Sequence, residues 1–464
     1  MRSIFPNKME NYMRIIIVGC GKIGTTIIDS LVKEGHDVVA IDDNNDVVTE
    51  VSNIYDIMCV CGNGADSEVL SEAGVDKAEM FVAVAGSDEL NMLSCFIAKK
   101  MGAKKTVARI RNPEYNGSSL EFLRSQLSIS SAINPEKLCA QELYNILRLP
   151  GAAKIETFSN RKFEMIELKL KTDSKLDGLS LAEMRKKYQG QYLVSAVKRE
   201  DKVFIPDGNF VLRGGDKVGI MATAAEAQKL FKMLGILQKQ ARSVIILGGS
   251  KTAFYLAKRL LAGGHDVKII EKNRQRCEEI SNALPGAVVI CGDGAQQELL
   301  LEEGLSRSDA FVALTGMDEE NILISIFASS QNVPKVISKV SRIELLSMAE
   351  NLGLECTVSP RLIISDVIST YARALKNSMG SNVETLYKLM DGAAEALEFK
   401  VQSDFKYIGI PLRDMDLKKN TLIAGIIRGK KIIIPSGSDT IEAGDRVVVL
   451  AAGQRLHDLS DIIR

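Results

Sequence analysis

The chain has 464 residues and carries 59 basic and 59 acidic side chains, so its formal net charge is zero. This length is typical of two to four domains, because a single hydrophobic core seldom grows beyond about 250–300 residues. The balanced charge excludes the global basic field that drives non-specific binding to DNA or RNA.

The first twelve residues show neither the apolar region nor the cleavage site of a secretory signal. We expect them to be a frayed extension, with Met13 as the true start. No apolar run approaches the ~20 residues that a membrane-spanning helix needs, so we expect the chain not to cross a bilayer. The eight cysteines form no CxxC pair, which favours reduced thiols, and we expect Cys59 and Cys61 to be buried at a strand end.

From residue 14 to residue 110, short apolar strands alternate with amphipathic helices. This alternation predicts βαβ units around a parallel sheet with helices on both faces. Residues 134–151 then predict a connecting helix that starts at Pro135 and is stopped by Pro150 and Gly151. Residues 155–235 change to strands joined by hairpin signals such as Asp207-Gly208, which predict a small α+β module.

A repeat of about 230 residues runs through the whole chain. Gly19 and Gly248 are 229 residues apart, and "GHDV", "IPDG"/"IPSG" and "GGDKV"/"AGDRV" recur at the same offset. "CGNGA"/"CGDGA" and "FVAVAGSDELN"/"FVALTGMDEEN" recur one residue later, which indicates a single insertion. The period is far longer than the 20–50 residues of solenoid repeats, so a multi-domain block has been duplicated. We call the two copies the first and the second block.

The predicted fold class is therefore α/β, with two Rossmann-like, doubly wound parallel sheets, each followed by a small α+β domain. The expected boundaries are 1–12 for the N-terminal extension, 13–134 for the first Rossmann domain, 135–153 for a crossover helix and linker, 154–238 for the first small domain, 241–360 for the second Rossmann domain, 361–383 for a second crossover helix and linker, and 384–464 for the second small domain.

The stretch "RIIIVGCGKIG" places G-x-G-x-x-G between a predicted strand and a predicted helix. In this motif Gly19 makes the tight turn, Gly21 lets the backbone approach a pyrophosphate, and Gly24 allows close packing of helix on strand. Asp42 ends the next strand, where a carboxylate accepts from ribose hydroxyls and disfavours a 2′-phosphate. We interpret the motif as a dinucleotide site, with a merely structural turn as the alternative.

The second block keeps Gly248 and Gly249 but has Ser250 and Ala253 where the first has Gly21 and Gly24. These side chains partly obstruct the approach of a pyrophosphate. Glu271 still offers a carboxylate for ribose at the position of Asp42. Retained nucleotide binding and a retained fold without binding both remain open for this block.

Further candidates lie where later strands end, at the edge where open α/β sheets bind ligands. Arg109 and its counterpart Lys339 each keep a cation there, suited to a phosphate, with a surface cation as the alternative. Ala85 and Gly86 are positioned to contact a nucleotide through their backbone. Asp88 and Asp318 follow as candidate helix caps.

No catalytic constellation is evident in the sequence. His36 and His265 occupy the two "GHDV" turns and His457 a C-terminal helix, positions that favour turn or packing roles. An NAD-dependent oxidoreductase with a substrate site between domains remains the alternative from another class, although a second nucleotide-like domain stands where such an enzyme has its substrate domain. A redox-sensing repressor is a further alternative, but neither a helix-turn-helix nor a basic stripe is apparent.

Residues 13–464 resemble the TrkA family of potassium-uptake regulatory subunits, which consist of paired RCK (KTN) domains, each an RCK-N followed by an RCK-C. The likeness rests on "IIIVGCGKIG", Asp42, "CGNGADSEVL", "VAVAGSDELN", "ARIRNPEY" and "INPE", and on "GLSLAEM", "IPDG" and "GGDKV" in the small domain. Ser250 and Ala253 depart from the usual glycine-rich turn, which leaves the nucleotide preference of the second block open.

The resemblance implies a sensor that is not an enzyme and that binds NAD(H), with ATP and ADP also ligands in the family. It implies a homo-oligomeric cytoplasmic ring, expected to be a tetramer, attached to the inner face of the cell membrane through a potassium-translocating Trk-type subunit. The implied nucleotide contacts of the first block are Gly19, Cys20, Gly21, Lys22, Ile23, Gly24, Asp42, Ala85, Gly86 and Arg109. Those expected in the second block are Gly248, Gly249, Ser250, Glu271 and Lys339.

Overall fold

A computed structural model describes residues 12–115, 117–148, 154–158, 163–200, 202–236, 241–377, 383–454, 456 and 458–464. The chain divides into two compact units, which we describe one at a time. One unit runs up to Leu138 and adds Pro360–Lys376, and the other contains Cys139–Ser359 and Asn377–Arg464.

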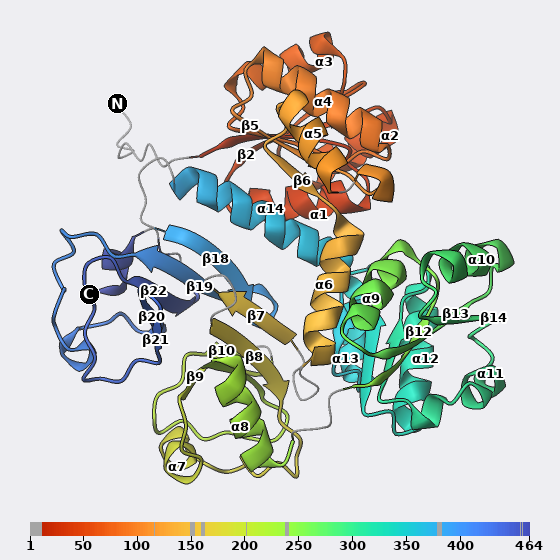
Figure 1. The fold of residues 1–464 in the computed structure, drawn as a ribbon. Coiled ribbons are helices and arrows are strands. Elements are labelled where there is room, and N and C mark those ends of the chain that lie inside the picture. Colours follow the sequence, from red (N-terminus) through yellow and green to blue (C-terminus); the bar gives the residue numbers. More distant parts are fainter. Residues whose placement is uncertain are drawn as a thin grey trace, which may run out of the picture. The chain divides into compact units, whose positions relative to one another are not determined.

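The first Rossmann domain alternates strands and helices in the predicted manner (Figure 1). Its elements are β1 (Arg14–Val18), α1 (Lys22–Lys33), β2 (Asp37–Asp42), α2 (Asn45–Ile54), β3 (Met58–Cys61), α3 (Ser67–Glu72), η1 (Val75–Lys77), β4 (Met80–Ala83), α4 (Asp88–Met101), β5 (Lys105–Arg109), η2 (Pro113–Tyr115), α5 (Ser118–Gln126) and β6 (Ser131–Ile133).

These six strands form one parallel sheet in the order β3-β2-β1-β4-β5-β6. The order reverses between β1 and β4, and open α/β sheets bind ligands at the carboxyl ends of the strands on either side of such a point. Side chains from α1 and α2 cover one face of the sheet. Those from α3, α4 and α5 cover the other, so the sheet is doubly wound as predicted.

The helix α14 (Pro360–Asn377) belongs to the core of this same unit, although it follows the second Rossmann domain in the chain. Ile364, Ile368 and Ala372 are buried against the face of the sheet that α1 covers. Polar contacts with α1 accompany them, with 2.9 Å between the hydroxyls of Ser30 and Ser369. The sequence pattern predicts the helix but not this location.

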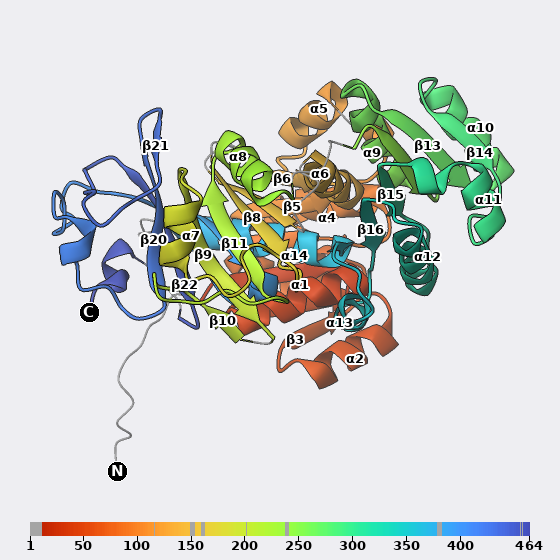
Figure 2. The same ribbon diagram turned by 90° about the horizontal axis from the view of Figure 1, so that it is seen from below.

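The second unit contains the second Rossmann domain, which repeats the plan of the first. Its sheet has the order β14-β13-β12-β15-β16-β17, and Figure 2 shows helices flanking it. Its elements are β12 (Ser243–Leu247), α9 (Lys251–Ala262), β13 (Asp266–Glu271), α10 (Arg274–Ala283), β14 (Val288–Cys291), α11 (Gln297–Glu302), η3 (Leu305–Arg307), β15 (Ala310–Ala313), α12 (Asp318–Ser330), β16 (Lys335–Lys339), α13 (Glu344–Asn351) and β17 (Thr357–Val358).

Two small antiparallel sheets complete the second unit, in the orders β10-β9-β11-β8-β7 and β18-β19-β22-β20-β21. The first comprises β7 (Lys154–Phe158), β8 (Phe163–Lys169), α7 (Leu181–Lys187), β9 (Tyr192–Arg199), β10 (Lys202–Phe204), β11 (Lys217–Ala222) and α8 (Ala224–Leu234). The second comprises β18 (Val383–Leu389), η4 (Met390–Gly392), β19 (Ala394–Lys400), η5 (Leu412–Asp414), β20 (Thr421–Arg428), β21 (Lys431–Ile433), β22 (Arg446–Ala452) and η6 (Leu459–Ile462).

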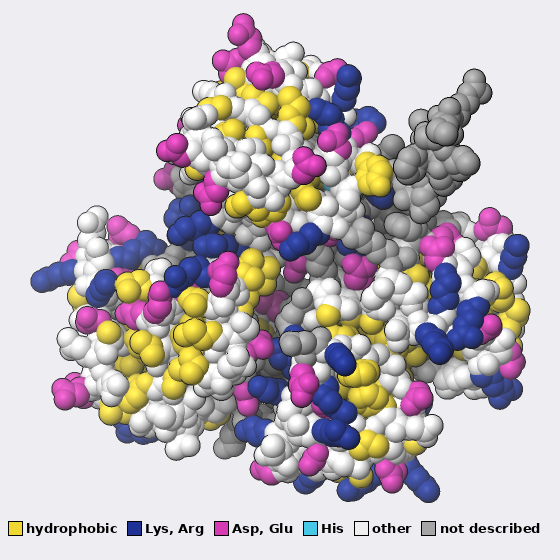
Figure 3. Space-filling model, turned by 180° about the vertical axis from the view of Figure 1, so that it is seen from behind, with side chains coloured by type: hydrophobic (Ala, Val, Ile, Leu, Met, Phe, Trp, Pro, Cys, Tyr) yellow, Lys and Arg dark blue, Asp and Glu magenta, His cyan; other side chains and the backbone are white. Residues whose placement is uncertain are grey.

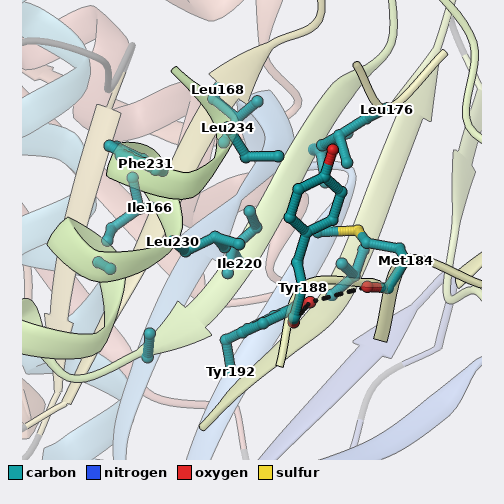
Figure 4. Close-up of a cluster of buried hydrophobic side chains, with 14 of the residues drawn as sticks. Ile166, Leu168, Leu176, Met184, Tyr188, Tyr192, Ile220, Leu230, Phe231 and Leu234 are labelled. Atoms are coloured by element: carbon teal, nitrogen blue, oxygen red, sulfur yellow. Dashed lines mark hydrogen bonds between the residues drawn. The ribbon is translucent and has the colours of Figure 1, made fainter. Parts of the chain in front are cut away.

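The core of the first small domain lies between its sheet and α8, where Leu230 and Phe231 pack against Ile166 and Ile220 (Figure 4). Tyr192 is buried in this core, and its hydroxyl donates to the carbonyl of Tyr188 at 2.5 Å. Burial raises the pKa of Tyr192 to about 12. Because a buried hydroxyl needs a partner, this hydrogen bond explains how a polar atom is accommodated in an apolar core.

The two small sheets share a buried apolar layer within the second unit. The layer includes Met165, Ala196 and Met221 of the first small sheet, Ala396 of the second small sheet and Met390 of η4. The backbone N–H of Met390 also donates to a carboxylate oxygen of Glu167 at 3.1 Å. The duplication therefore pairs the two small domains within one chain.

Several smaller expectations have definite outcomes. The connecting helix α6 (Pro135–Arg148) begins at Pro135 as predicted, whereas Pro150, Gly151, His457 and residues 1–11 lie outside the described residues. Cys61 is exposed and Cys59 is half-buried, so the prediction that both thiols are buried is wrong, because β3 is an edge strand. Among the helices in the described ranges, none is long and apolar enough to cross a membrane.

Basic and acidic side chains are interspersed on the face of the molecule that Figure 3 shows.

Candidate functional site

The turn between β1 and α1 requires glycine at two positions. Gly19 has a φ of +92°, and a Cβ there would lie 2.6 Å from the backbone nitrogen of Ala85. A Cβ on Gly24 would lie 1.9 Å from the carbonyl oxygen of Gly19. Any side chain at either position would push the helix or the end of β4 away, so the turn holds α1 tightly against the sheet.

Gly21 differs from these two glycines because a Cβ there would meet nothing within 4 Å. Its backbone is extended, so packing and strain do not demand glycine. Gly21 is the N-cap of α1, no side chain among the described residues caps the helix, and no acidic residue lies in the first turn. This helix start is exposed at Gly21 and Lys22, and the uncapped N–H groups of a helix start suit an anion.

Asp42 organises the turn through its two carboxylate oxygens. One accepts from the backbone N–H of Cys20 at 2.7 Å and the other from that of Asn44 at 3.0 Å. The Cys20 side chain is buried, and this burial raises the pKa of its thiol to about 12. Cys20 thus contributes its backbone alone, whereas half-buried Asp42 keeps acceptor capacity toward the ligand edge.

Arg109, at the end of β5, is 9% exposed, so the alternative of a surface cation is wrong. One of its terminal nitrogens donates to the carbonyl of Ala85 at 2.6 Å. Its Nε is buried and has no hydrogen-bond partner among the described residues. Burial lowers the pKa of Arg109, and the nearby Arg111 lowers it further. A guanidinium that is desolvated and incompletely paired is suited to an anionic ligand.

The sequence reasoning missed the role of Asn91, which is fully buried on α4. Its side-chain amide donates to the carbonyls of Ala85 at 3.1 Å and Arg109 at 2.9 Å. It therefore ties the end of β4 to the end of β5. Asn321 makes the equivalent bond to the carbonyl of Lys339, at 3.0 Å. The recurrence of asparagine in "DELN" and "DEEN" is the signal that could have identified this pair.

The interpretation of Asp88 and Asp318 as helix caps is also wrong. Ser87 is the N-cap of α4, and its hydroxyl accepts from the N–H of Leu90. Asp88 is buried and accepts from the backbone N–H groups of Arg111 and Asn112, at 2.8 and 2.7 Å. Asp318 does the same for the loop after β16. These carboxylates thus fix the loops that border the ligand edge.

In the second block the helix start after the glycine turn is capped by a side chain. Gly248 has a φ of +93°, like Gly19, but Ser250 is the N-cap of α9 and its hydroxyl accepts from the N–H of Ala253 at 3.3 Å. Ala253 is accommodated in a fully buried position. The helix start that is open at Gly21 is therefore partly satisfied here.

Glu271 repeats the arrangement of Asp42. Its oxygens accept from the backbone N–H groups of Gly249 at 2.6 Å and Asn273 at 2.8 Å. Lys339 ends β16 in a half-buried position.

Each Rossmann domain therefore gathers its predicted residues at the carboxyl edge of its own sheet. In the first block they follow β1, β2, β4 and β5, with Gly86 exposed and open where a Cβ would point. This arrangement can hold a ribose and a phosphate by backbone N–H groups, a carboxylate and a guanidinium. Within the described part of the chain, no group of three or more His, Cys, Asp or Glu side chains could hold a metal ion.

Two family models match the chain. The TrkA-N domain matches residues 15–135 and 244–360, and the TrkA-C domain matches 165–235 and 396–464. The chain is 35% identical to a Trk system potassium uptake protein TrkA homolog of Archaeoglobus fulgidus, over 97% of this chain and 100% of the relative. It is 31% identical to the Trk system potassium uptake protein TrkA of Vibrio alginolyticus, over 96% of each chain.

Solved structures of similar fold include the GsuK RCK domain, with a TM-score of 0.63 at 16% identity over 97% of this chain and 94% of that chain. The GsuK channel bound to NAD has the same TM-score and identity over 97% of this chain and 78% of its own. These likenesses bear on the fold alone. Both family models match in tandem and curated relatives align over nearly the full length, so the chain belongs to the TrkA family of Trk system potassium uptake proteins.

Proposed function

We propose that the chain is the nucleotide-sensing regulatory subunit of a Trk-type potassium uptake system. It binds NAD(H) in its first Rossmann domain, with ATP and ADP as further ligands, and gates a potassium-translocating membrane subunit. The observation that carries this proposal is Arg109, a buried guanidinium at the ligand edge of the glycine turn, whose Nε has no hydrogen-bond partner in the part of the chain that the structure describes.

The residues of the first block fit the parts of a dinucleotide. The helix start at Gly21, Lys22 and Ile23 is uncapped and open, which suits a pyrophosphate. Asp42 is half-buried at the end of β2, where a carboxylate accepts from ribose hydroxyls. Arg109 supplies the positive charge, and the backbone of Ala85 and Gly86 borders the same edge. Bound NAD(H) acts here as a signal, and no bond has to break.

We propose that Gly248, Gly249, Ser250, Glu271 and Lys339 form a second, different nucleotide site. The hydroxyl of Ser250 occupies part of the donor set that a pyrophosphate would use. The ammonium of Lys339 can attract a phosphate as a point charge, whereas the planar guanidinium of Arg109 can bind a phosphate through two N–H groups at once. The domain boundaries stated above are part of the same proposal, and the two small domains join neighbouring chains or bind a regulator.

Regulation then follows from unequal binding to two conformations of a ring of these chains, expected to be a tetramer beneath the membrane on its cytoplasmic side. A nucleotide that binds one ring conformation more tightly shifts the population toward it, and the membrane subunit responds to the shift. Couplings of this kind are of order 1–3 kcal/mol. The names of the relatives, which are potassium uptake proteins, and the NAD-bound GsuK channel of the same fold support this direction.

The test is Gly21→Val in the full-length chain. A Cβ at this position meets nothing within 4 Å beyond the neighbouring backbone, so we expect the valine side chain to occupy the space proposed for the ligand without disturbing the fold. We expect the NADH affinity of the first site to fall at least tenfold, measured by calorimetric titration.

The matched control is Gly208→Val in the first small domain, where a Cβ makes only an ordinary contact at 3.9 Å with Ala182. We expect its NADH titration to equal that of the wild type. Unchanged NADH binding in Gly21→Val, with both variants folded, would remove the site from the β1–α1 turn.

A further inference from the structure

The segment from the end of the second strand to the first turn of the next helix reverses its charge between the two blocks. In the first block it carries Asp42, Asp43 and Asp46 and no basic residue. The equivalent segment of the second block, 229 residues later, keeps one acid in Glu271 and adds the cations Lys272, Arg274 and Arg276. In Rossmann domains this segment borders the adenosine ribose, so the reversal changes the charge at the place where a 2′-hydroxyl or a 2′-phosphate is recognised.

Arg276 is held on the glycine turn. Its Nε donates to the carbonyl of Gly249 at 2.8 Å, and its Nη1 lies 2.7 Å from a carboxylate oxygen of Glu279. Its side chain is 34% exposed, and within the described residues no hydrogen bond engages Nη2. The first block has Val47 at this position, a partly buried apolar residue. The guanidinium is thus a feature of the second block alone, and Arg276 and the carboxylate of Glu271 both bind the backbone of Gly249.

The one negative charge of Glu271 is outnumbered by the three cations of this segment. Its oxygens accept the backbone N–H groups of Gly249 and Asn273, as those of Asp42 do in the first block. Lys272 and Arg274 are exposed, and Arg274 pairs with Glu278 at 3.4 Å, so that Lys272 contributes most to the further positive potential. At the same time Ser250 caps α9, which weakens the helix start as an anion site. Anion recognition in the second block therefore shifts from the glycine turn to the segment between the end of β13 and the first turn of α10.

We infer that the second Rossmann domain binds an adenine dinucleotide phosphorylated on the ribose, of the NADP(H) class, while the first domain binds the unphosphorylated form. The inference rests on the proposed function, in which both Rossmann domains bind nucleotides. Arg276 is the specificity-determining residue, since an arginine beside the ribose carboxylate accommodates a 2′-phosphate and can hold it through two N–H groups. One chain would then read two cofactor pools.

The experiment uses the full-length chain carrying Gly21→Val, which disables the first site and leaves the second to be titrated. NADPH, NADH and ATP are compared by calorimetry. We expect NADPH to bind at least tenfold more tightly than NADH or ATP. Arg276→Gln keeps a donor for the carbonyl of Gly249 but removes the charge, and we expect it to weaken NADPH at least tenfold and NADH much less.

The control is Arg307→Gln, which removes the same charge from an exposed residue before β15, at the opposite edge of the same sheet. We expect it to leave NADPH binding unchanged. A second arm grafts Val47→Arg and Asp43→Lys into the first block of an otherwise wild-type chain, and we expect the NADPH-to-NADH preference of that site to rise.

The failures are distinguishable. If NADH or ATP binds the second site as tightly as NADPH, or if Arg276→Gln leaves NADPH binding unchanged, the inference is overturned while a second nucleotide site stands. If none of the three ligands binds in the Gly21→Val background, the second site itself is lost from the proposed function. The first site is judged separately, by comparing wild type with Gly21→Val.

Discussion

At the scale of single residues, Arg109 is the most informative side chain of the first block. It is 9% exposed, its Nε has no hydrogen-bond partner within the described ranges, and burial lowers the pKa of its guanidinium. An arginine nevertheless stays protonated, so the protein carries a largely buried positive charge at the ligand edge. Such a charge costs stability in the folded state unless an anion compensates it. A bound anion would offset this loss of folding stability, so the buried charge is consistent with a role in ligand binding.

We therefore expect Arg109→Met to separate binding from stability. The carbonyl of Ala85 keeps its bond from Asn91, so removing the guanidinium leaves no backbone acceptor unsatisfied. The melting temperature of the nucleotide-free protein should not fall, whereas the NADH affinity should fall at least tenfold. Thermal unfolding with and without NADH measures both.

Arg111→Met is the contrasting variant, because its Nε donates to Glu136 at 2.6 Å and its loss leaves a mostly buried carboxylate without that partner. It should lower the melting temperature. An Arg109→Met protein that melts earlier yet binds NADH normally would show that the guanidinium is structural.

At the scale of elements, α14 shows how the duplicated chain is tied together. The helix lies far along the sequence but belongs to the core of the first Rossmann domain, where Ile368 is fully buried. Glu34, at the end of α1, pairs with Arg373 at 2.8 Å, and both side chains are largely buried. A closely packed helix with a buried ion pair has one docking position, so α14 is an integral part of that domain.

We expect Ile368→Ala to destabilise the first Rossmann domain by about 2–5 kcal/mol, the range for removing a fully buried isoleucine side chain. Hydrogen exchange followed by mass spectrometry resolves the effect locally, because a multi-domain chain need not unfold in one step. Amides of β1 and β2 should exchange faster, while those of β12 and β13 should not change. The control Leu352→Ala, at a half-exposed position, should leave all four strands unaffected. Equal protection of β1 in the Ile368→Ala protein would argue against this docking.

At the scale of the whole molecule, duplication has produced two Rossmann domains that share a fold but differ in their candidate ligand sites. The strand orders of the two Rossmann sheets correspond, as do the buried asparagines and aspartates beside their ligand edges. The glycine turn, the cation after the fifth strand and the loop after the second strand differ. Two domains of the same fold with different sites suit a protein that responds to two different nucleotides.

For the assembled system we expect Gly21→Val to uncouple potassium flux from NADH. In proteoliposomes that contain a Trk-type membrane subunit, the NADH concentration for half-maximal effect should rise at least tenfold, or the effect should vanish. Copurification with the membrane subunit should persist, because the substitution lies in an open space of the first Rossmann domain. A normal flux response to NADH would contradict a sensing role for the first site.

Much of this protein is determined by local sequence patterns. The period of the apolar residues predicts the strands and helices of both blocks, and the repeat predicts the domain plan. The glycines of the first turn are predictable because their requirement is local: a positive φ at Gly19 and a helix packed at Gly24. The positions of Asp42 and Glu271 follow in the same way, since each ends the second strand of its sheet.

Long-range contacts decided the rest, because burial and pairing depend on residues that are distant in the chain. Arg109 is a buried, incompletely paired cation only because β4, α4 and β5 converge around it. Asp88 is a loop tether and not a cap because the chain returns beside it after β5. Arg276 lies at the glycine turn because α10 places its Nε 2.8 Å from the carbonyl oxygen of Gly249. The sequence by itself determined the secondary structure of the Rossmann domains and their repetition, and only the tertiary structure decided which charged side chains lie together at each ligand edge.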